Sequence, residues 1–230
     1  MRVDVAFAPE LAKPAPTAIV IDVLRATSTI AQALDAGYER IYCCVGVEDA
    51  RELRSGLGHG VLAGERRCVR IPGFDLGNSP REFLEPADRA AILTTTNGTR
   101  ALVAAAERAE RVFAASLLNL SAIAEAARDA GEDVSIVCAG VEGAFAMDDA
   151  YCAGRLVAEL ACEPTDAAHA AARISDSFET AEAGLRASQS GRNLLAAELE
   201  EDIAWCARAD VLHLAPRVLG TTPLAVEVGI

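Results

Sequence analysis

The sequence predicts an α/β protein, a three-layer α/β/α sandwich with a mostly parallel central sheet. Short apolar runs alternate with longer stretches of helical periodicity along the 230 residues. This alternation favours parallel strands joined by crossover helices. Runs that are apolar at every position are typical of strands buried on both faces. Because no linker or composition break divides the chain, we expect one domain over residues 1–230.

The elements are expected in a regular order. Short apolar runs predict strands at 18–21, 40–45, 61–63, 90–94, 111–115 and 134–138. Helical spacing, with glycine after several segments, predicts helices at 29–36, 48–55, from the turn at 95–99 to about 108, 120–129 and 148–160. The tail reads as mostly helical, with candidates at 167–174, 177–187 and 193–206 and a last strand near 211–214.

Composition excludes several classes of function. A net charge of −13 argues against nucleic-acid binding, which needs a basic face, although a local arginine pocket could still hold a small anion. Lys13 is the only lysine, so a Walker-type phosphate loop is absent and Schiff-base chemistry would depend on that one residue. The seven cysteines form no Cys-x-x-Cys pair and are interpreted as reduced and mostly buried.

No segment reads as a targeting signal or a membrane span. The N-terminus lacks a charged region followed by an apolar core, and no run of about twenty apolar residues occurs. We therefore expect a cytoplasmic protein with no membrane partner. A second copy of the chain, in a homodimer, is a further candidate partner.

The stretch Gly64–Pro80 is the most distinctive segment. It gathers two acids, three arginines, three glycines, an asparagine and a serine beside an apolar run. Carboxylate and amide oxygens suit Mg²⁺, arginines suit phosphate oxygens, and glycines allow close approach of the backbone to an anion. A Gly/Pro turn with scattered surface charge is the competing interpretation.

Three strand-to-helix turns are also unusually polar. Asp22 and Arg25 follow the first predicted strand, the segment 94–100 follows the fourth, and Asp148 and Asp149 begin a helix after the sixth. In such sheets the site lies beyond the carboxyl ends of the strands, and helix N-termini there favour anions. Capping explains the hydroxyls of these turns but gives no reason for Asp22 and Arg25. Of the adjacent acids, at most one should face a site, because the two point different ways on a helix.

Other charged residues carry no such signal. Asp176, Glu179 and Asp202 are interpreted as ordinary helix surface charges. The inventory of acids, arginines, hydroxyls and glycines on one sheet edge is that of Mg²⁺-assisted phosphoryl chemistry.

Five blocks of sequence, in order along most of the chain, resemble the signature blocks of the 2-phosphosulfolactate phosphatase family. The blocks are 22–28, 64–66, 73–80, 94–99 and 138–140. The resemblance implies a Mg²⁺-dependent acid phosphatase that hydrolyses 2-phospho-3-sulfolactate to sulfolactate and phosphate, a step in coenzyme M synthesis. It also implies an α/β/α fold special to the family and a small anionic phosphorylated substrate as partner.

We assign candidate roles to residues of these blocks and to Asp148, which follows the last of them. The catalytic candidates are Asp22, Arg25, Glu65 and Asp75. Mg²⁺ is expected on carboxylates among Asp22, Glu65, Asp75 and Asp148. The substrate-binding candidates are Arg66, Asn78, Ser79, Thr96, Asn97, Gly98 and Thr99. Arg67 and Arg70 fall outside the matched positions and are interpreted as surface charges.

The sequence leaves the specificity, the nucleophile and the class of function open. Ser190 stands where the family tends to have histidine, so activity or specificity could differ here. An activated water is the favoured nucleophile over Asp22 itself, because Leu24 replaces the second acid of an Asp-x-Asp motif. The alternative functions are a phosphatase for another small phosphorylated carboxylic acid and a non-catalytic protein that binds phosphorylated anions.

Overall fold

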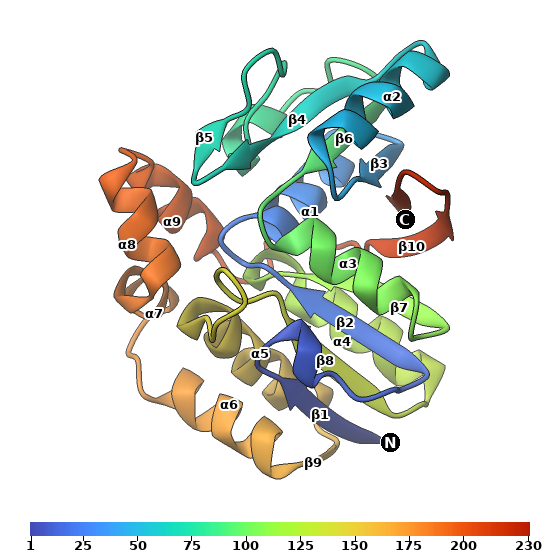
Figure 1. The fold of residues 1–230 in the computed structure, drawn as a ribbon. Helices are drawn as coiled ribbons and strands as arrows, with labels where there is room; N and C mark the ends of the chain where they lie inside the picture. The colour runs from blue at the N-terminus through green and yellow to red at the C-terminus, as the bar shows by residue number, and fades with distance from the viewer.

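The computed structural model describes all residues, 1–230, and shows an α/β protein whose open, mostly parallel sheet is flanked by helices (Figure 1). The eleven strands lie in the order β5-β4-β6-β3-β11-β10-β7-β2-β8-β1-β9. Their bounds are β1 Arg2–Ala6, β2 Thr17–Ile21, β3 Arg40–Cys43, β4 Val61–Arg66, β5 Val69–Arg70, β6 Ala90–Thr94, β7 Arg111–Ala115, β8 Val134–Cys138, β9 Glu163–Pro164, β10 Arg217–Thr221 and β11 Val226–Gly229.

The sheet consists of two parallel blocks joined by the C-terminal hairpin. Strands β4, β6 and β3 are parallel, as are β7, β2, β8, β1 and β9. The antiparallel hairpin β10–β11 lies between β7 and β3 and pairs with both. The prediction of a last strand near 211–214 is therefore wrong: that segment is irregular, and the hairpin follows it.

Nine α-helices cover the sheet. Their bounds are α1 Ala26–Ala36, α2 Val47–Leu57, α3 Gly98–Ala106, α4 Leu120–Ala130, α5 Met147–Leu160, α6 Asp166–Asp176, α7 Ala181–Ala187, α8 Gln189–Ala196 and α9 Glu200–Cys206, with short 3₁₀ turns at Pro9–Leu11, Pro80–Phe83 and Leu117–Asn119. The helix expected at 193–206 is instead α8 and α9, because Glu198 takes a left-handed conformation between them. Thr180 and Ser188 cap α7 and α8, which divide the tail further.

Alternate residues of β2 show the three layers. Ile19 and Ile21 belong to a core shared with α4 and α5, whereas Ala18 and Val20 belong to a second core shared with α1 and α3. Because helices pack on both faces of the sheet, β2 must be apolar on both of its sides. None of the nine helices combines the length and apolar composition needed to cross a bilayer.

Candidate active site

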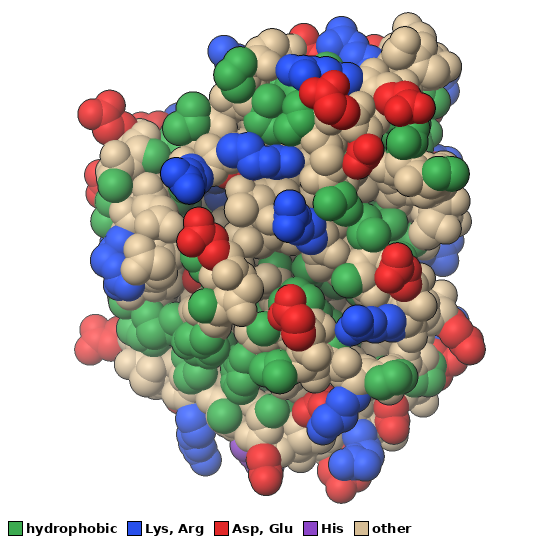
Figure 2. All heavy atoms as spheres, in the orientation of Figure 1, with side chains coloured by type: hydrophobic (Ala, Val, Ile, Leu, Met, Phe, Trp, Pro, Cys, Tyr) green, Lys and Arg blue, Asp and Glu red, His purple; other side chains and the backbone are tan.

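A cleft of about 620 Å³ opens where the strands β2, β4, β6 and β8 end. Its walls come from the turns that follow these strands and from α8, which closes the far side. In Figure 2, which has the orientation of Figure 1, several Lys or Arg side chains lie over β4 and β5. The polar turns that the sequence singled out therefore meet at one place, the position expected for a ligand in an open α/β sheet.

Asp22 lies at the end of β2 and lines the cleft, although it is 8% exposed. The backbone N–H groups of Ala26 and Gly98 hydrogen-bond its carboxylate. Burial, followed by the nearby charges of Asp148 and Glu65, raises its pKa to about 7. Three carboxylates close enough to repel one another favour a compensating cation.

Arg25 is the buried cation of the cleft. Its Nη1 donates to Asp202 Oδ2 at 2.6 Å, and Ser79 Oγ donates to the other oxygen of Asp202 at 2.6 Å. Its Nη2 donates to Cys68 O at 3.5 Å. The guanidinium is thus held from two sides against the cleft wall, a geometry suited to phosphate oxygens. The interpretation of Asp202 as a surface charge is wrong, since its side chain is 1% exposed; Asp176 and Glu179 are exposed as expected.

Glu65 joins two loops of the cleft. Its Oε1 accepts hydrogen bonds from Thr96 N at 2.8 Å and Thr96 Oγ1 at 3.0 Å, and its Oε2 accepts one from Cys68 N at 2.8 Å. Both oxygens are therefore engaged with the protein. The geometry makes Glu65 a group that holds the β4–β5 and β6–α3 turns together at the cleft.

The adjacent acids at the start of α5 have different hydrogen-bond partners. Asp148 accepts a hydrogen bond from Ser190 Oγ at 3.1 Å, and Ser190 lines the cleft. Burial raises the pKa of Asp148 to about 6, although the hydrogen bond from Ser190 opposes the shift. Asp149 instead accepts from the N–H groups of Val23 and Gly140, both at 3.0 Å, and so ties two loops together. Neither acid lines the cleft itself; Asp148 contacts it through Ser190, whereas Asp149 is bonded to backbone groups of two loops.

Two candidates lie elsewhere. Asp75 is exposed, does not line the cleft, and accepts hydrogen bonds from Arg54 Nη1 at 3.0 Å and Leu62 N at 2.9 Å. Arg66 donates to the carbonyls of Glu65 and Thr94 and to Thr94 Oγ1. It clamps strand ends and does not line the cleft. The structure thus separates Asp75 and Arg66 from the other candidates.

Arg67 is expected to be a surface charge outside the site, but the structure places it at the cleft. It lines the cleft, whereas its neighbour Arg70 is exposed outside it, as expected. Arg66 and Arg67 are adjacent, so which of them faces the cleft depends on where β4 ends and its turn begins. Positive φ angles at Arg67 and Cys68, 53° and 66°, mark that turn. Sequence reasoning missed Arg67 because nothing local shows the register of the turn.

The remaining substrate-binding candidates divide into two groups. Asn78, Thr96 and Asn97 line the cleft. Ser79 acts through Asp202, and the buried Thr99 exchanges hydrogen bonds with Thr95 at the start of α3. The amide oxygen of Asn78 is buried and has no hydrogen-bond partner. A buried acceptor without a donor is costly, so it suits a bound ligand or cation.

Gly98 packs against Asp22 at the start of α3. A Cβ built on Gly98 would lie 2.5 Å from Asp22 Oδ2 and 2.5 Å from Ala26 Cβ. Only a residue without a side chain permits this approach. Gly98 thus shapes the site through the position of the Asp22 carboxylate.

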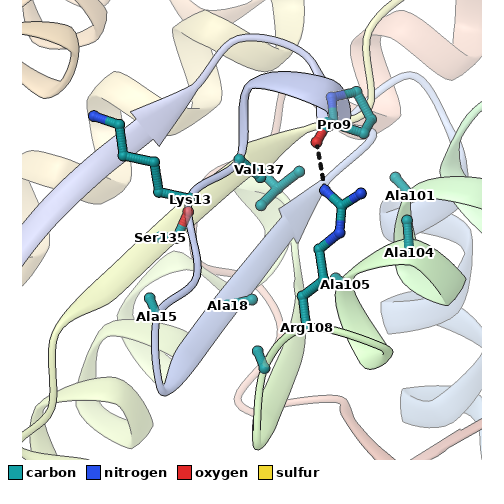
Figure 3. Close-up of a pocket in the computed structure, with 12 residues that line it drawn as sticks. Pro9, Lys13, Ala15, Ala18, Ala101, Ala104, Ala105, Arg108, Ser135 and Val137 are labelled. Carbon is teal, nitrogen blue, oxygen red and sulfur yellow. Dashed lines mark hydrogen bonds between the residues drawn. The ribbon is translucent and has the colours of Figure 1, made fainter.

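A second, smaller cavity lies away from these residues, between the first 3₁₀ turn, α3 and β8 (Figure 3). It measures about 20 Å³ and is lined mainly by alanines, with Arg108 Nη1 donating to Pro9 O at 3.4 Å. That volume holds about one water molecule. The cavity is too small for a phosphorylated substrate. A third hollow, of about 400 Å³, shares Arg25, Cys68 and Asn78 with the cleft and adjoins it on the side of Arg70 and Asp202. The cleft with this extension is therefore the candidate active site.

Comparisons with known proteins assign the chain to a family. The family model described as 2-phosphosulpholactate phosphatase matches residues 6–220. The chain belongs to this family. A probable 2-phosphosulfolactate phosphatase of Thermus thermophilus is 41% identical over 96% of this chain and 94% of its own length. Proteins of the same name from Thermotoga maritima and Pseudothermotoga lettingae are 39% and 37% identical, over 94% and 93% of this chain and 95% and 94% of their own lengths.

Membership in the 2-phosphosulfolactate phosphatase family makes the chain an enzyme, a phosphoric monoester hydrolase. The resemblance carried by the five sequence blocks is thereby confirmed. Four of the five blocks contribute residues to the lining of the cleft, and the fifth, at 138–140, supplies the N–H of Gly140 that binds Asp149.

Proposed function

We propose that this enzyme hydrolyses 2-phospho-3-sulfolactate to 3-sulfolactate and inorganic phosphate, with Mg²⁺ as cofactor. The names of its relatives support the substrate. The observation that carries the proposal is the pairing, in one cleft, of a fixed arginine and a buried carboxylate: Arg25 can grip the phosphate, and Asp22 lies beside it in the wall. Arginine and carboxylate at a sheet edge are the groups that phosphoryl transfer requires.

The donor set fits Mg²⁺ held through few protein ligands. No three His, Cys, Asp or Glu side chains converge closely enough to form a metal cage. Mg²⁺, however, is usually held by one or two carboxylates, with waters and substrate phosphates completing its shell. Asp22 and Asp148 would be these carboxylates, and Asn78 offers a further oxygen without a partner. We drop Asp75, which does not line the cleft, and Glu65, whose two oxygens both accept hydrogen bonds from backbone N–H groups.

When bound, Mg²⁺ would neutralise charge on the phosphoryl oxygens and make a water more acidic. The residues of the chain have separate tasks. Arg25 binds the phosphate and is kept in place by Asp202. Thr96 and Asn97 line the cleft at the start of α3, where Glu65 fixes their turn. Asp22, held by the N–H groups of Ala26 and Gly98, orients the attacking water.

Attack by Asp22 on phosphorus is the competing mechanism. The second position after Asp22 is Leu24, so the acid that would assist an aspartyl phosphate is absent from that turn. Hydrolysis of a substrate whose phosphorus is made chiral with oxygen isotopes distinguishes the two. Inversion of configuration at phosphorus supports direct attack by water, whereas retention supports two successive displacements through a covalent aspartyl phosphate.

The variant Asp22→Asn tests the assignment directly. With saturating Mg²⁺, it should reduce phosphate release by at least about a hundredfold, as expected when a group at the reacting centre is lost. Asp176→Asn, a surface change, is the control. Turnover of Asp22→Asn near that of the wild type would remove Asp22 from the chemistry.

A different small phosphorylated acid is the second candidate substrate. Ser190, where the family tends to have histidine, lines the cleft and donates to Asp148, so the wall differs at a point next to the proposed metal ligands. A panel that compares phosphosulfolactate with phosphoglycolate and phosphoglycerate decides by kcat/KM. Binding of these compounds without any phosphate release would instead support a non-catalytic binding protein.

A further inference from the structure

Arg67 is the cleft arginine that neither the family blocks nor the proposed chemistry uses. It is exposed at the turn between β4 and β5 and lines the cleft. Its backbone has φ of 53°, a left-handed conformation that is uncommon for a side chain other than glycine or asparagine. The turn therefore holds a long cation over the mouth of the site.

The neighbouring arginines are all engaged, and Arg67 is not. Arg25 is paired with Asp202, and Arg66 donates to carbonyl oxygens of its own strand and of β6. Arg70 donates to the backbone oxygen of Asp75 at 3.1 Å. The guanidinium of Arg67 has no hydrogen bond or ion pair with the protein. It is thus the arginine of this hairpin that is free to bind a ligand.

The charge on the cleft mouth is asymmetric. Glu142, in the loop between β8 and α5, also lines the cleft and is exposed, with φ of 50° and no ion pair. Its backbone N–H donates to Asn97 Oδ1 at 3.2 Å, which anchors this loop to the β6–α3 turn. An acidic group on the substrate is therefore attracted toward the β4–β5 turn and repelled from the β8–α5 loop.

We infer that Arg67 determines specificity by binding a second acidic group of the substrate, a carboxylate or a sulfonate, while the phosphate lies at Arg25. This inference rests on the proposed function. The cleft, at about 620 Å³, has room for both groups. A guanidinium binds either oxyanion through paired N–H donors. The substrate class is thus a phosphomonoester that carries at least one further strong acid.

Binding of the second acidic group by Arg67 predicts a specific effect on the kinetic constants. The second acidic group does not change charge during hydrolysis, so Arg67 should bind it equally in the ground state and the transition state. Loss of such an interaction raises KM and leaves kcat unchanged. A structural disturbance of the hairpin would instead lower kcat, because Cys68 and Glu65 of the same hairpin touch the site.

The test compares three substrates with zero, one and two further acidic groups: glycerol 2-phosphate, 2-phosphoglycerate and 2-phospho-3-sulfolactate. For the two acidic compounds, Arg67→Gln should raise KM about tenfold, the effect of losing one charge-assisted contact at an exposed site. For glycerol 2-phosphate, Arg67→Gln should change KM less than about twofold. For all three substrates, kcat should stay at the wild-type value. If only the sulfonate compound responds, the sulfonate is the group bound.

Two further variants serve as controls. Arg128→Gln removes the same charge from an exposed position on α4 that lines neither the cleft nor the hollow beside it, so its KM values should stay near those of the wild type. Glu142→Gln removes the repelling charge and should lower KM for the acidic compounds about twofold at low salt.

The inference is overturned if Arg67→Gln changes KM equally for all three substrates, or if Arg128→Gln has the same effect. Failure of the proposed function looks different, because the wild type would then not hydrolyse 2-phospho-3-sulfolactate. In that case calorimetry with 2-phosphoglycerate still decides. Equal binding by the wild type and Arg67→Gln would overturn the inference, and about tenfold weaker binding by Arg67→Gln would support it.

Discussion

Arg25 and Asp202 form a buried ion pair in which Nη1 lies 2.6 Å from Oδ2 and the two side chains are 3% and 1% exposed. The pair joins the turn after β2 to α9, 177 residues later in the chain. Ser79 Oγ donates to the second oxygen of Asp202. Because both oxygens of the carboxylate are engaged, Asp202 fixes the position of the arginine proposed to bind phosphate.

Asp202→Asn should keep hydrogen-bond partners for Arg25 and Ser79 but leave the buried guanidinium without a counter-charge. We expect a loss of about 1–3 kcal/mol in the free energy of unfolding, and about 3–5 kcal/mol for Asp202→Ala, which removes the acceptor altogether. Both variants should raise KM, because Arg25 binds the phosphate in the ground state. Urea unfolding and steady-state kinetics measure the two effects.

The control for this pair is Asp176→Asn. Asp176 also pairs with an arginine, Arg173 at 3.4 Å, but both side chains are largely exposed. Exposed pairs contribute little, so stability and KM should stay near wild type. Equal KM values for Asp202→Asn and wild type would show that Arg25 is positioned without Asp202.

Glu65→Gln tests the link between the two turns at the cleft. A glutamine has one oxygen, so it cannot accept from the N–H groups of both Thr96 and Cys68. One partly buried N–H would lose its partner, and the free energy of unfolding should fall by about 1 kcal/mol. Hydrogen exchange of these two amides, compared with Glu48→Gln on exposed α2, measures the loss. Unchanged exchange at both amides would contradict the role assigned to Glu65.

The sequence predicts the parts of the site that depend on local pattern. A strand followed by a polar turn marks Asp22, Glu65 and Thr96, since the carboxyl ends of parallel strands meet at one edge. No strand followed by a polar turn precedes Asp202, so the sequence pattern does not single it out. On a short helix it looks like any surface acid, and only the packing of α9 against the cleft buries it.

The same limit applies to the fold. The core strands are continuously apolar and could be predicted, whereas β10 alternates between exposed and partly buried residues and gives a weaker signal. Its place between β7 and β3 follows from long-range pairing that no local pattern contains. The strand β1 was also missed, because its run is short and interrupted by Asp4.

Protonation of the buried acids predicts how stability depends on pH. Burial, above all, raises the pKa of Asp22 to about 7 and that of Asp148 to about 6, from an ordinary value of 3.8. The folded state therefore binds more protons than the unfolded state in this range, and stability falls as pH rises from about 4 to about 7. Without Mg²⁺, the melting temperature should be lower at pH 8 than at pH 5.

Mg²⁺ should reverse this loss, because a cation compensates the ionised carboxylates. The rise in melting temperature on adding Mg²⁺ should be larger at pH 8 than at pH 5, since protons compete with the ion at acid pH. Asp148→Asn should weaken both the pH dependence and the response to Mg²⁺. A response to Mg²⁺ that is equal at the two pH values would contradict the proposed carboxylate ligands.

Gly98→Ala tests whether the position of the Asp22 carboxylate controls the reaction. The new methyl group would lie 2.5 Å from Asp22 Oδ2 and from Ala26 Cβ, so the carboxylate or the start of α3 must shift. A displacement of about 1 Å at a reacting group can cost about a hundredfold in rate, and we expect kcat to fall by that order. Gly56→Ala, in α2 with no atom within 4 Å of its added Cβ, is the matched control. It should keep full activity and gain up to about 1 kcal/mol in the free energy of unfolding, because alanine favours helix over glycine. Retention of kcat by Gly98→Ala, with a normal melting temperature, would show that the reaction tolerates a displaced Asp22.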